Sequence, residues 1–290
     1  MKQISLFSTV CLIAILITAC GQAQATKPPI SKPEPTRVEF QASDGYNLVG
    51  YYYPSPLPNA PTIVLMHMWR TTQQEWVRLG LVDWLQNWPV NASSEDTLAP
   101  AQMSIYPPMP NGVAFNVFTF DYRGHGESGP EIDFYSLKVE QVDQLLASWL
   151  LDSKAAYEKA KTLPGVDPTR VAGIGASLGG NGVVYACGET CLGALLLSPG
   201  EFPNLPYKDV VKTLDDAGKP VWCIAQEKDQ FKSAETCQSA SGAHYKSIIY
   251  PEDKGEYGLH GMALLLPDVA PPNIGQHILD FLLLVFKSDQ

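Results

Sequence analysis

Six short runs along the chain are apolar at most of their positions, which is typical of strands buried on both faces of a sheet. The predicted strands span residues 61–66, 113–120, 170–176, 192–198, 220–225 and 245–250. Segments typical of helices lie between and after these runs. The predicted helices span residues 71–88, 136–161, 180–186, 208–217, 233–241 and 274–286. This alternation predicts an α/β fold with a mostly parallel central sheet and helices on both faces.

A different pattern opens the domain. Residues 36–43 and 46–53 alternate between polar and apolar side chains, and Asp44-Gly45 between them is a strong turn signal. Two such runs around an Asp-Gly pair predict a β-hairpin.

Two connections bear on how a site is covered. Residues 90–112 show little periodicity and are rich in Pro, Ser, Asn and Ala. An irregular segment of this length is uncommon unless it covers or shapes a site. About twenty residues separate Ser198 from Pro220, which leaves room for a crossover helix but not for a large inserted cap domain.

The N-terminus predicts export. Residues 10–17 form an apolar stretch too short to span a bilayer, and Lys2 precedes it. The stretch ends in Ile17-Thr-Ala-Cys-Gly21, which resembles the bacterial lipobox, whose cysteine is acylated and becomes the new N-terminus. We expect a lipoprotein signal peptide over residues 1–19, a lipid on Cys20 and a proline-rich tether over residues 20–36. An ordinary cleaved secretory signal is the alternative.

Either signal exports the folded domain, residues 37–290, to the periplasm or the cell exterior. The 290 residues are 45% hydrophobic, enough for one substantial core, and their formal net charge is −10 with no basic run. This charge argues against nucleic acid as a class of partner. The partners we expect are a membrane, reached through the N-terminal lipid, and a small-molecule substrate.

Export also permits disulfides. Apart from Cys11 in the signal and Cys20, the cysteines are Cys187, Cys191, Cys223 and Cys237. Four cysteines allow three connectivities. Two local bridges are favoured, because one pair flanks a short loop and the other joins a strand to the helix after it; free buried thiols are the alternative. A zinc site is not favoured, because no histidine lies near either pair at the spacing of zinc ligands.

The strongest chemical signal is Gly175-Ala-Ser-Leu-Gly179, a G-x-S-x-G pattern between a predicted strand and a predicted helix. A serine on so tight a turn brings strand and helix close together, so that residues without a side chain fit best two positions before and after it. The pattern therefore predicts that Ser177 exposes its hydroxyl above the sheet; a glycine-rich structural turn is the alternative.

A serine hydroxyl needs a base to become a nucleophile, and the base needs an orienting carboxylate. His260 follows the last predicted strand, and Asp229 follows the strand at residues 220–225. The chain order of serine, acid and histidine suits this fold. Glu227 is the alternative acid.

Together these motifs resemble the α/β-hydrolase superfamily, closest to its lidless dienelactone hydrolase-like and small carboxylesterase branch, over roughly residues 37–287. The matching positions are His67, residues 121–128 (DYRGHGES), the Ser177 turn, Glu227-Lys-Asp229 and His260-Gly261. The resemblance implies that Ser177 is the nucleophile, His260 the general base and Asp229 the orienting acid. The other four histidines are then structural or surface residues.

The resemblance also implies an oxyanion hole made by the backbone N–H groups of Leu178 and Trp69. Here the chain departs from the family pattern, because Met68 stands where a glycine follows the first histidine. Trp69, Trp76 and residues 106–109 are candidates for lining an acyl pocket, although packing in the core is the more common role of such side chains.

The implied function is an esterase that cleaves small to medium acyl groups through an acyl-enzyme and needs no metal and no cofactor. A peptidase or amidase with the same three residues is the nearest alternative. A surface binding protein that kept the fold without catalysis is an alternative from a different class.

Overall fold

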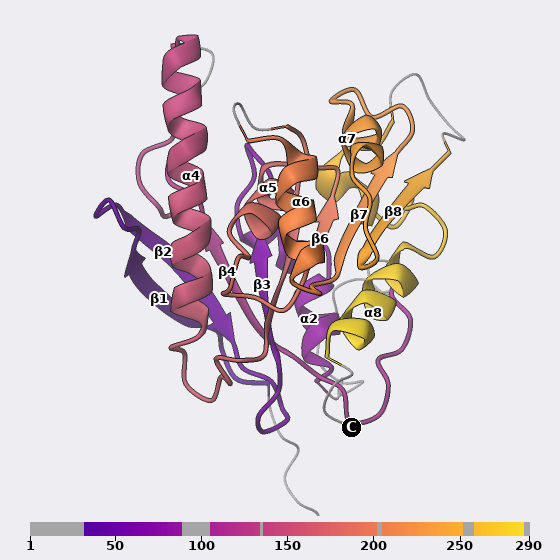
Figure 1. Ribbon diagram of the computed structural model, residues 1–290. Helices are drawn as coiled ribbons and strands as arrows, with labels where there is room; N and C mark the ends of the chain where they lie inside the picture. Colours follow the sequence, from indigo (N-terminus) through magenta and orange to yellow (C-terminus); the bar gives the residue numbers. More distant parts are fainter. Residues whose placement is uncertain (1–31, 89–104, 134–135, 202–204, 252–257, 287–290) are drawn as a thin grey trace, which may run out of the picture. The chain divides into compact units, whose positions relative to one another are not determined.

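The structure is a computed structural model, and it describes residues 32–88, 105–133, 136–201, 205–251 and 258–286. Within these residues, eight strands form one sheet in the order β1-β2-β4-β3-β5-β6-β7-β8 (Figure 1). The strands are β1 (Thr36–Gln41), β2 (Asn47–Tyr53), β3 (Thr62–Met66), β4 (Asn116–Asp121), β5 (Val171–Ala176), β6 (Ala194–Leu197), β7 (Val221–Gln226) and β8 (Tyr245–Tyr250). The pairs β1–β2 and β2–β4 are antiparallel, and the others are parallel. The predicted hairpin and mostly parallel sheet are confirmed.

The helices are α1 (Gln74–Arg78), α2 (Leu81–Gln86), α4 (Val139–Ala160), α5 (Leu178–Tyr185), α6 (Tyr207–Asp216), α7 (Ser233–Ser239), α8 (Ile274–Val285) and the 3₁₀ helix η2 (Gly261–Leu265). The prediction of one helix over residues 71–88 is wrong. The chain forms α1 and α2 instead, because Gly80 between them adopts a φ of 74°, in the left-handed region that interrupts a helix. The helix η2 was not predicted, and most of the irregular segment 90–112 lies outside the described residues.

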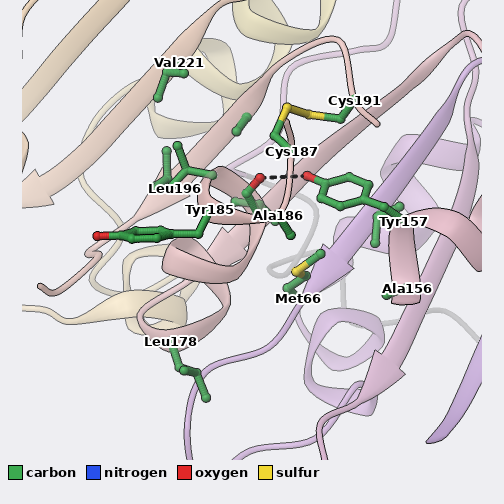
Figure 2. Close-up of a cluster of buried hydrophobic side chains, with 14 of the residues drawn as sticks. Met66, Ala156, Tyr157, Leu178, Tyr185, Ala186, Cys187, Cys191, Leu196 and Val221 are labelled. Atoms are coloured by element: carbon green, nitrogen blue, oxygen red, sulfur yellow. Dashed lines mark hydrogen bonds between the residues drawn. A yellow bond between two sulfur atoms is a disulfide. The ribbon is translucent and has the colours of Figure 1, made fainter. Parts of the chain in front are cut away.

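Two apolar clusters lie on opposite faces of the sheet. Side chains of β3 alternate between them, with Val64 and Met66 in the cluster under α4 to α7, and Ile63 and Leu65 in the cluster under α1, α2 and α8. Figure 2 shows part of the first cluster, where Tyr157 points from α4 toward α5 and its hydroxyl donates to a carbonyl of α5 at 3.0 Å. Helices therefore cover both faces, as the alternation of elements predicted.

Both local disulfides are present. Cys187 pairs with Cys191 between α5 and β6, and Cys223 of β7 pairs with Cys237 of α7; all four side chains are buried. Disulfides are typical of proteins that leave the reducing cytosol. The second bridge closes a loop that contains Asp229, so it fixes the position of that carboxylate relative to the sheet.

The export features have no structural description, because the signal peptide, Cys20 and the tether up to residue 31 lie outside the described residues. The described helices include none with the length and apolar character that a membrane crossing requires.

The loop after β4 is held by buried polar contacts. Asp121 accepts backbone N–H bonds from Gln73 at 2.8 Å and Glu127 at 3.0 Å, which makes it a turn-forming residue. Arg123 donates to the buried Asp152 of α4 at 2.7 Å and to Asp44 of the hairpin turn at 2.6 Å. One loop therefore connects the hairpin, the sheet and α4.

His67, at the end of β3, belongs to the same buried region. Its Nε2 accepts the backbone N–H of Tyr122 at 3.1 Å, so the proton lies on Nδ1, which donates to the carbonyl of Met68 at 2.8 Å. Burial, together with the neighbouring His125, lowers the pKa of His67 to about 3. His67 is therefore neutral at physiological pH, as this pair of hydrogen bonds requires.

Removal of the disulfide around Asp229 is expected to be costly. The double variant Cys223→Ala/Cys237→Ala should lower the free energy of unfolding by about 3 kcal/mol, since the bridge closes a loop with a sequence separation of 14. The matched control is Cys187→Ala/Cys191→Ala, whose separation is 4 and whose loss should be smaller by about 1 kcal/mol. Urea titration measures both losses, and a larger loss in the control would contradict this account.

Acidification is expected to destabilise the protein through His67. Its pKa is about 3 in the folded state against 6.5 for an ordinary histidine. The unfolded chain therefore takes up a proton first as the pH falls below 6.5, and stability present above that pH is lost. From about pH 7.5 to about pH 4.5, His67 should remove about 2–3 kcal/mol from the free energy of unfolding.

The comparison that isolates this contribution is His67→Gln, because an amide oxygen can accept the Tyr122 N–H but takes up no proton in this range. The acid-dependent loss of stability in urea titrations should be smaller in this variant by about the same 2–3 kcal/mol. His244→Gln, at an exposed histidine, should follow the wild type. Identical pH dependence in wild type and His67→Gln would refute the assignment.

Candidate active site

Ser177 lies on a strained turn between β5 and α5. Its φ of 50° and ψ of −117° are unusual for a residue with a side chain, and its N–H donates to the carbonyl of Leu197 at 2.8 Å. A Cβ on Gly175 would lie 2.0 Å from the carbonyl oxygen of Gly179, and a Cβ on Gly179 would lie 2.0 Å from that of Met66. The turn therefore excludes side chains at both flanking positions, which is the steric reason for the G-x-S-x-G spacing.

The structure brings Ser177, His260 and Asp229 together. His260 Nε2 lies 2.8 Å from Ser177 Oγ, and His260 Nδ1 lies 2.7 Å from Asp229 Oδ2. Because a carboxylate only accepts, the imidazole proton lies on Nδ1, and Nε2 is left to accept the serine hydroxyl. The three side chains form one continuous chain of hydrogen bonds.

Asp229 is suited to remain ionised. Its side chain is buried, which alone would raise its pKa. The hydrogen bond from His260 and that from the N–H of Phe231, at 2.9 Å to Oδ1, outweigh burial and bring the pKa of Asp229 below its ordinary value. The alternative acid, Glu227, has an exposed side chain, while Asp229 is the carboxylate bonded to His260.

The segment that bears His260 is anchored to the end of β7. The side-chain oxygen of Gln226 accepts the N–H of Leu259, and the N–H of Gly258 donates to the carbonyl of Lys228 at 3.0 Å. The base and the acid are therefore held to the same strand end. Sequence reasoning missed Gln226, although a glutamine that ends an otherwise apolar buried strand was an available signal.

Phe231 was also missed. Its ring centroid lies 4.4 Å from that of His260, and 55% of the residue is exposed. An aromatic ring left open to solvent beside the imidazole provides an apolar surface at the mouth of the site. Nothing in the local sequence pattern distinguishes it from an ordinary loop residue.

The turn after β3 lies against the serine turn, since a Cβ on Gly179 would lie 2.6 Å from the carbonyl oxygen of His67. The Met68 carbonyl accepts from His67 Nδ1 and from Thr71 Oγ1, each at 2.8 Å. Across a trans peptide the N–H points opposite to the carbonyl. The N–H of Trp69 therefore points away from the side on which His67 and Thr71 hold this carbonyl.

The candidate oxyanion donors, the N–H groups of Leu178 and Trp69, lie on two neighbouring turns. Leu178 is the first residue of α5, so its N–H has no acceptor within the helix. On the other side, Arg70 has a φ of 64° and its N–H donates to His125 Nε2 at 3.2 Å, which fixes the end of the turn that carries Trp69. The structure thus places both candidate donors on turns that meet beside Ser177.

The remaining candidates have other contacts. Trp76 is fully buried in the cluster under α1, α2 and α8, and Tyr106 stacks on Trp84 in the same cluster, so both are packing residues. All five histidines lie within the described residues, and His260 is the one hydrogen-bonded to Ser177. The described part of the chain holds no group of three or more His, Cys, Asp or Glu arranged as metal ligands.

Comparison with known sequences gives only a partial match. No protein-family model matches the chain. The uncharacterized proteins YfhR of Salmonella typhi and Salmonella typhimurium are each 28% identical to it over 166 residues, which is 56% of this chain and 44% of YfhR. The match thus spans less than half the length of these curated relatives.

Comparison with solved structures covers most of the chain. The Pyrococcus furiosus esterase Pf2001 aligns with 86% of this chain and 91% of its own, at 16% identity and a TM-score of 0.54. The α/β hydrolase GrgF from Penicillium sp. sh18 aligns with 88% of this chain and 100% of its own, at 15% identity and a TM-score of 0.58. TT1662 from Thermus thermophilus aligns with 88% of this chain and 100% of its own, at 16% identity and a TM-score of 0.54. Identities this low show the fold alone, and together with the strand order they establish that this chain has the α/β-hydrolase fold.

Proposed function

We propose that this protein is a serine hydrolase that cleaves carboxylic esters of small to medium acyl groups through an acyl-enzyme. The observation that carries the proposal is the chain of hydrogen bonds from Ser177 through His260 to Asp229, at 2.8 Å and 2.7 Å. These lengths allow a proton to move between serine and imidazole without rearrangement. The resemblance to the dienelactone hydrolase-like and small carboxylesterase branch supports the same assignment.

In the proposed reaction, Ser177 Oγ attacks the ester carbonyl while His260 Nε2 takes its proton. The imidazolium that forms is stabilised by Asp229, which stays ionised because its pKa is low. His260 then protonates the leaving alcohol, and a water molecule, deprotonated by the same imidazole, hydrolyses the acyl-enzyme. No step requires a metal or a cofactor.

The N–H groups of Leu178 and Trp69 are the proposed donors to the oxyanion. A fixed donor of this kind contributes about 3 kcal/mol to the transition state. Between β6 and β7, the described residues contain one helix, α6, and no cap domain. The absence of a cap domain from the described residues between β6 and β7, together with the exposed ring of Phe231, supports a preference for short acyl chains and apolar leaving groups.

We further propose that the enzyme works outside the cytoplasm, anchored to a bacterial membrane by a lipid on Cys20. The two buried disulfides support export, and the lipobox-like sequence before Cys20 supports the anchor. The tether over residues 20–36 then separates the domain from the membrane surface.

The ester specificity is testable with p-nitrophenyl esters from acetate to palmitate. We expect the full chain to turn over the short esters fastest, and Ser177→Ala and His260→Ala to lower kcat by at least about a thousandfold. Asp229→Asn should also lower kcat strongly, because the neutral amide no longer orients or stabilises the imidazole. Glu227→Gln is the matched control and should retain the wild-type kcat.

The alternatives predict other results. Labelling of Ser177 by a fluorophosphonate without ester turnover would indicate a peptidase or amidase. If the protein neither turns over esters nor is labelled, the interpretation that remains is a binding protein that has the fold without catalysis. Retained activity in Asp229→Asn with loss in Glu227→Gln would reverse the assignment of the acid.

The lipid anchor has its own test. Cells that express the full chain and are fed labelled palmitate should incorporate the label into the wild type and not into Cys20→Ala. Ser8→Ala, upstream in the predicted signal, should leave incorporation intact. Labelling of Cys20→Ala equal to that of the wild type would contradict the anchor.

A further inference from the structure

Met68 occupies the position at which the chain departs from the family pattern, and its side chain contacts the segment that bears His260. Its Sδ accepts the backbone N–H of Met262 at 3.5 Å. A Cβ built on Gly261 would lie 3.0 Å from the same sulfur and 3.6 Å from Ser177 Cβ. The thioether therefore lies against the backbone just after the proposed base, on the side where Ser177 lies.

A second sulfur contact connects the same two segments, and here the segment after His260 supplies the sulfur. Met262 Sδ lies 3.8 Å from the hydroxyl oxygen of Thr71, which donates its proton to the Met68 carbonyl at 2.8 Å. The turn that carries the candidate oxyanion donor and the segment that carries the base are thus connected through two methionine side chains. A glycine at position 68 would remove the first of these contacts.

The two methionines differ in their access to solvent. Met262 is 3% exposed, whereas Met68 is only partly buried. Of the two methionines, Met68 is therefore the one more open to a small solute. Gly261, at the contact, has a φ of 57°, in the left-handed region that favours glycine, so the backbone passes close to the sulfur without a side chain between them.

We propose that Met68 is a positioning residue that holds the His260 segment against the oxyanion turn, and that oxidation of its sulfur to the sulfoxide switches the hydrolase off. This rests on the proposed function of Ser177 and His260. The oxidant is a peroxide, which can act outside the cytoplasm where the disulfides of this chain are stable.

The chemistry balances as a two-electron transfer. A lone pair of Met68 Sδ attacks one peroxide oxygen, the O–O bond breaks, and the displaced hydroxide takes the proton of the transferred hydroxyl to leave as water. The sulfur is oxidised by two electrons and the peroxide is reduced. The sulfoxide is larger and more polar than the thioether, and Met68 Sδ is in direct contact with the Met262 N–H and close to Gly261. We expect this change in size, polarity and geometry at the contact to displace the His260 segment.

A small displacement of a base is enough to stop the reaction, because proton transfer requires hydrogen-bond distance to Ser177. A misplacement of about 1 Å can lower a rate about a hundredfold. The effect is expected in kcat, while KM changes little, since Met68 acts on the arrangement of the reacting groups. Loss of folding would instead abolish both substrate binding and turnover, and the cooperative unfolding transition would disappear with them.

The experiment compares kcat and KM for p-nitrophenyl acetate before and after hydrogen peroxide, in the full-length wild type, Met68→Leu and Met109→Leu. Leucine keeps most of the volume but cannot be oxidised. Met109 is the matched control, because, like Met68, it is partly buried and packs against the cluster under α1, α2 and α8, whereas Met68 also accepts the N–H of Met262. Peptide mass spectrometry locates the added oxygen, and methionine sulfoxide reductases A and B test reversal.

We expect peroxide to lower the wild-type kcat about a hundredfold, with sulfoxide at Met68 and recovery by the reductases. Met109→Leu should respond like the wild type. Met68→Leu should lower the basal kcat, because it removes the acceptor of the Met262 N–H, but its remaining kcat should resist peroxide, whereas Met68→Gly should lose more kcat without peroxide.

Two results would overturn the proposal: peroxide inactivation of Met68→Leu equal to that of the wild type, or full activity with Met68 oxidised. Fluorophosphonate labelling of the untreated wild type separates this failure from that of the proposed function. If the untreated wild type is not labelled, both the proposed function and the role of Met68 are refuted. If it is labelled and one of the two results above is found, only the role of Met68 is refuted.

Discussion

The close approach of the serine turn to the end of β3 is the constraint on which the rest of the site depends. Ser177 has a left-handed φ of 50°, a backbone conformation that costs about 1–3 kcal/mol for a residue with a side chain. The surroundings hold it there, because Gly179 lies directly against the carbonyls of Met66 and His67 and the Ser177 N–H is bonded to β6. The strain is the consequence of placing a hydroxyl and the first N–H of α5 at one point above the sheet.

The acid, the base and the turn after β3 are each held in place by contacts of their own. The acid is held by a disulfide and by a backbone N–H, the base segment by Gln226 and Lys228, and the turn after β3 by the buried His67 and His125. The anchors of the acid and of the base lie at the end of β7, and those of the turn after β3 lie at the ends of β3 and β4, at the same edge of the parallel part of the sheet. The site is therefore assembled by the strand order, and none of its parts is fixed by local sequence alone.

Much of this arrangement was predictable. Continuous apolar runs identified the buried strands, and Asp44-Gly45 identified the hairpin, because burial and turn geometry leave direct signals in the residue pattern. The proximity of Ser177, Asp229 and His260 followed from their places after the carboxyl ends of three parallel strands, β5, β7 and β8. The break at Gly80 was missed because a single glycine is tolerated within many helices, and the pattern around it is helical on both sides.

The contacts that distinguish this chain could not be predicted from the sequence, although Gln226 stood out as a polar residue at the end of an apolar strand. Gln226, Phe231 and Met68 acquire their roles from loops that are far apart along the chain and meet only in the folded protein. Met68 in particular stood out as a departure from a pattern, but a departure alone does not reveal what the side chain touches. The structure supplies that contact, and with it a reason for a large residue at this position.

The most direct test of the central claim is the rate at which a fluorophosphonate labels the full-length protein, with the modified residue located by peptide mass spectrometry. We expect label on Ser177 alone, and a labelling rate at least about a hundredfold lower in His260→Ala. Label on another residue, or an unchanged rate without His260, would contradict the claim that these two side chains form a catalytic pair.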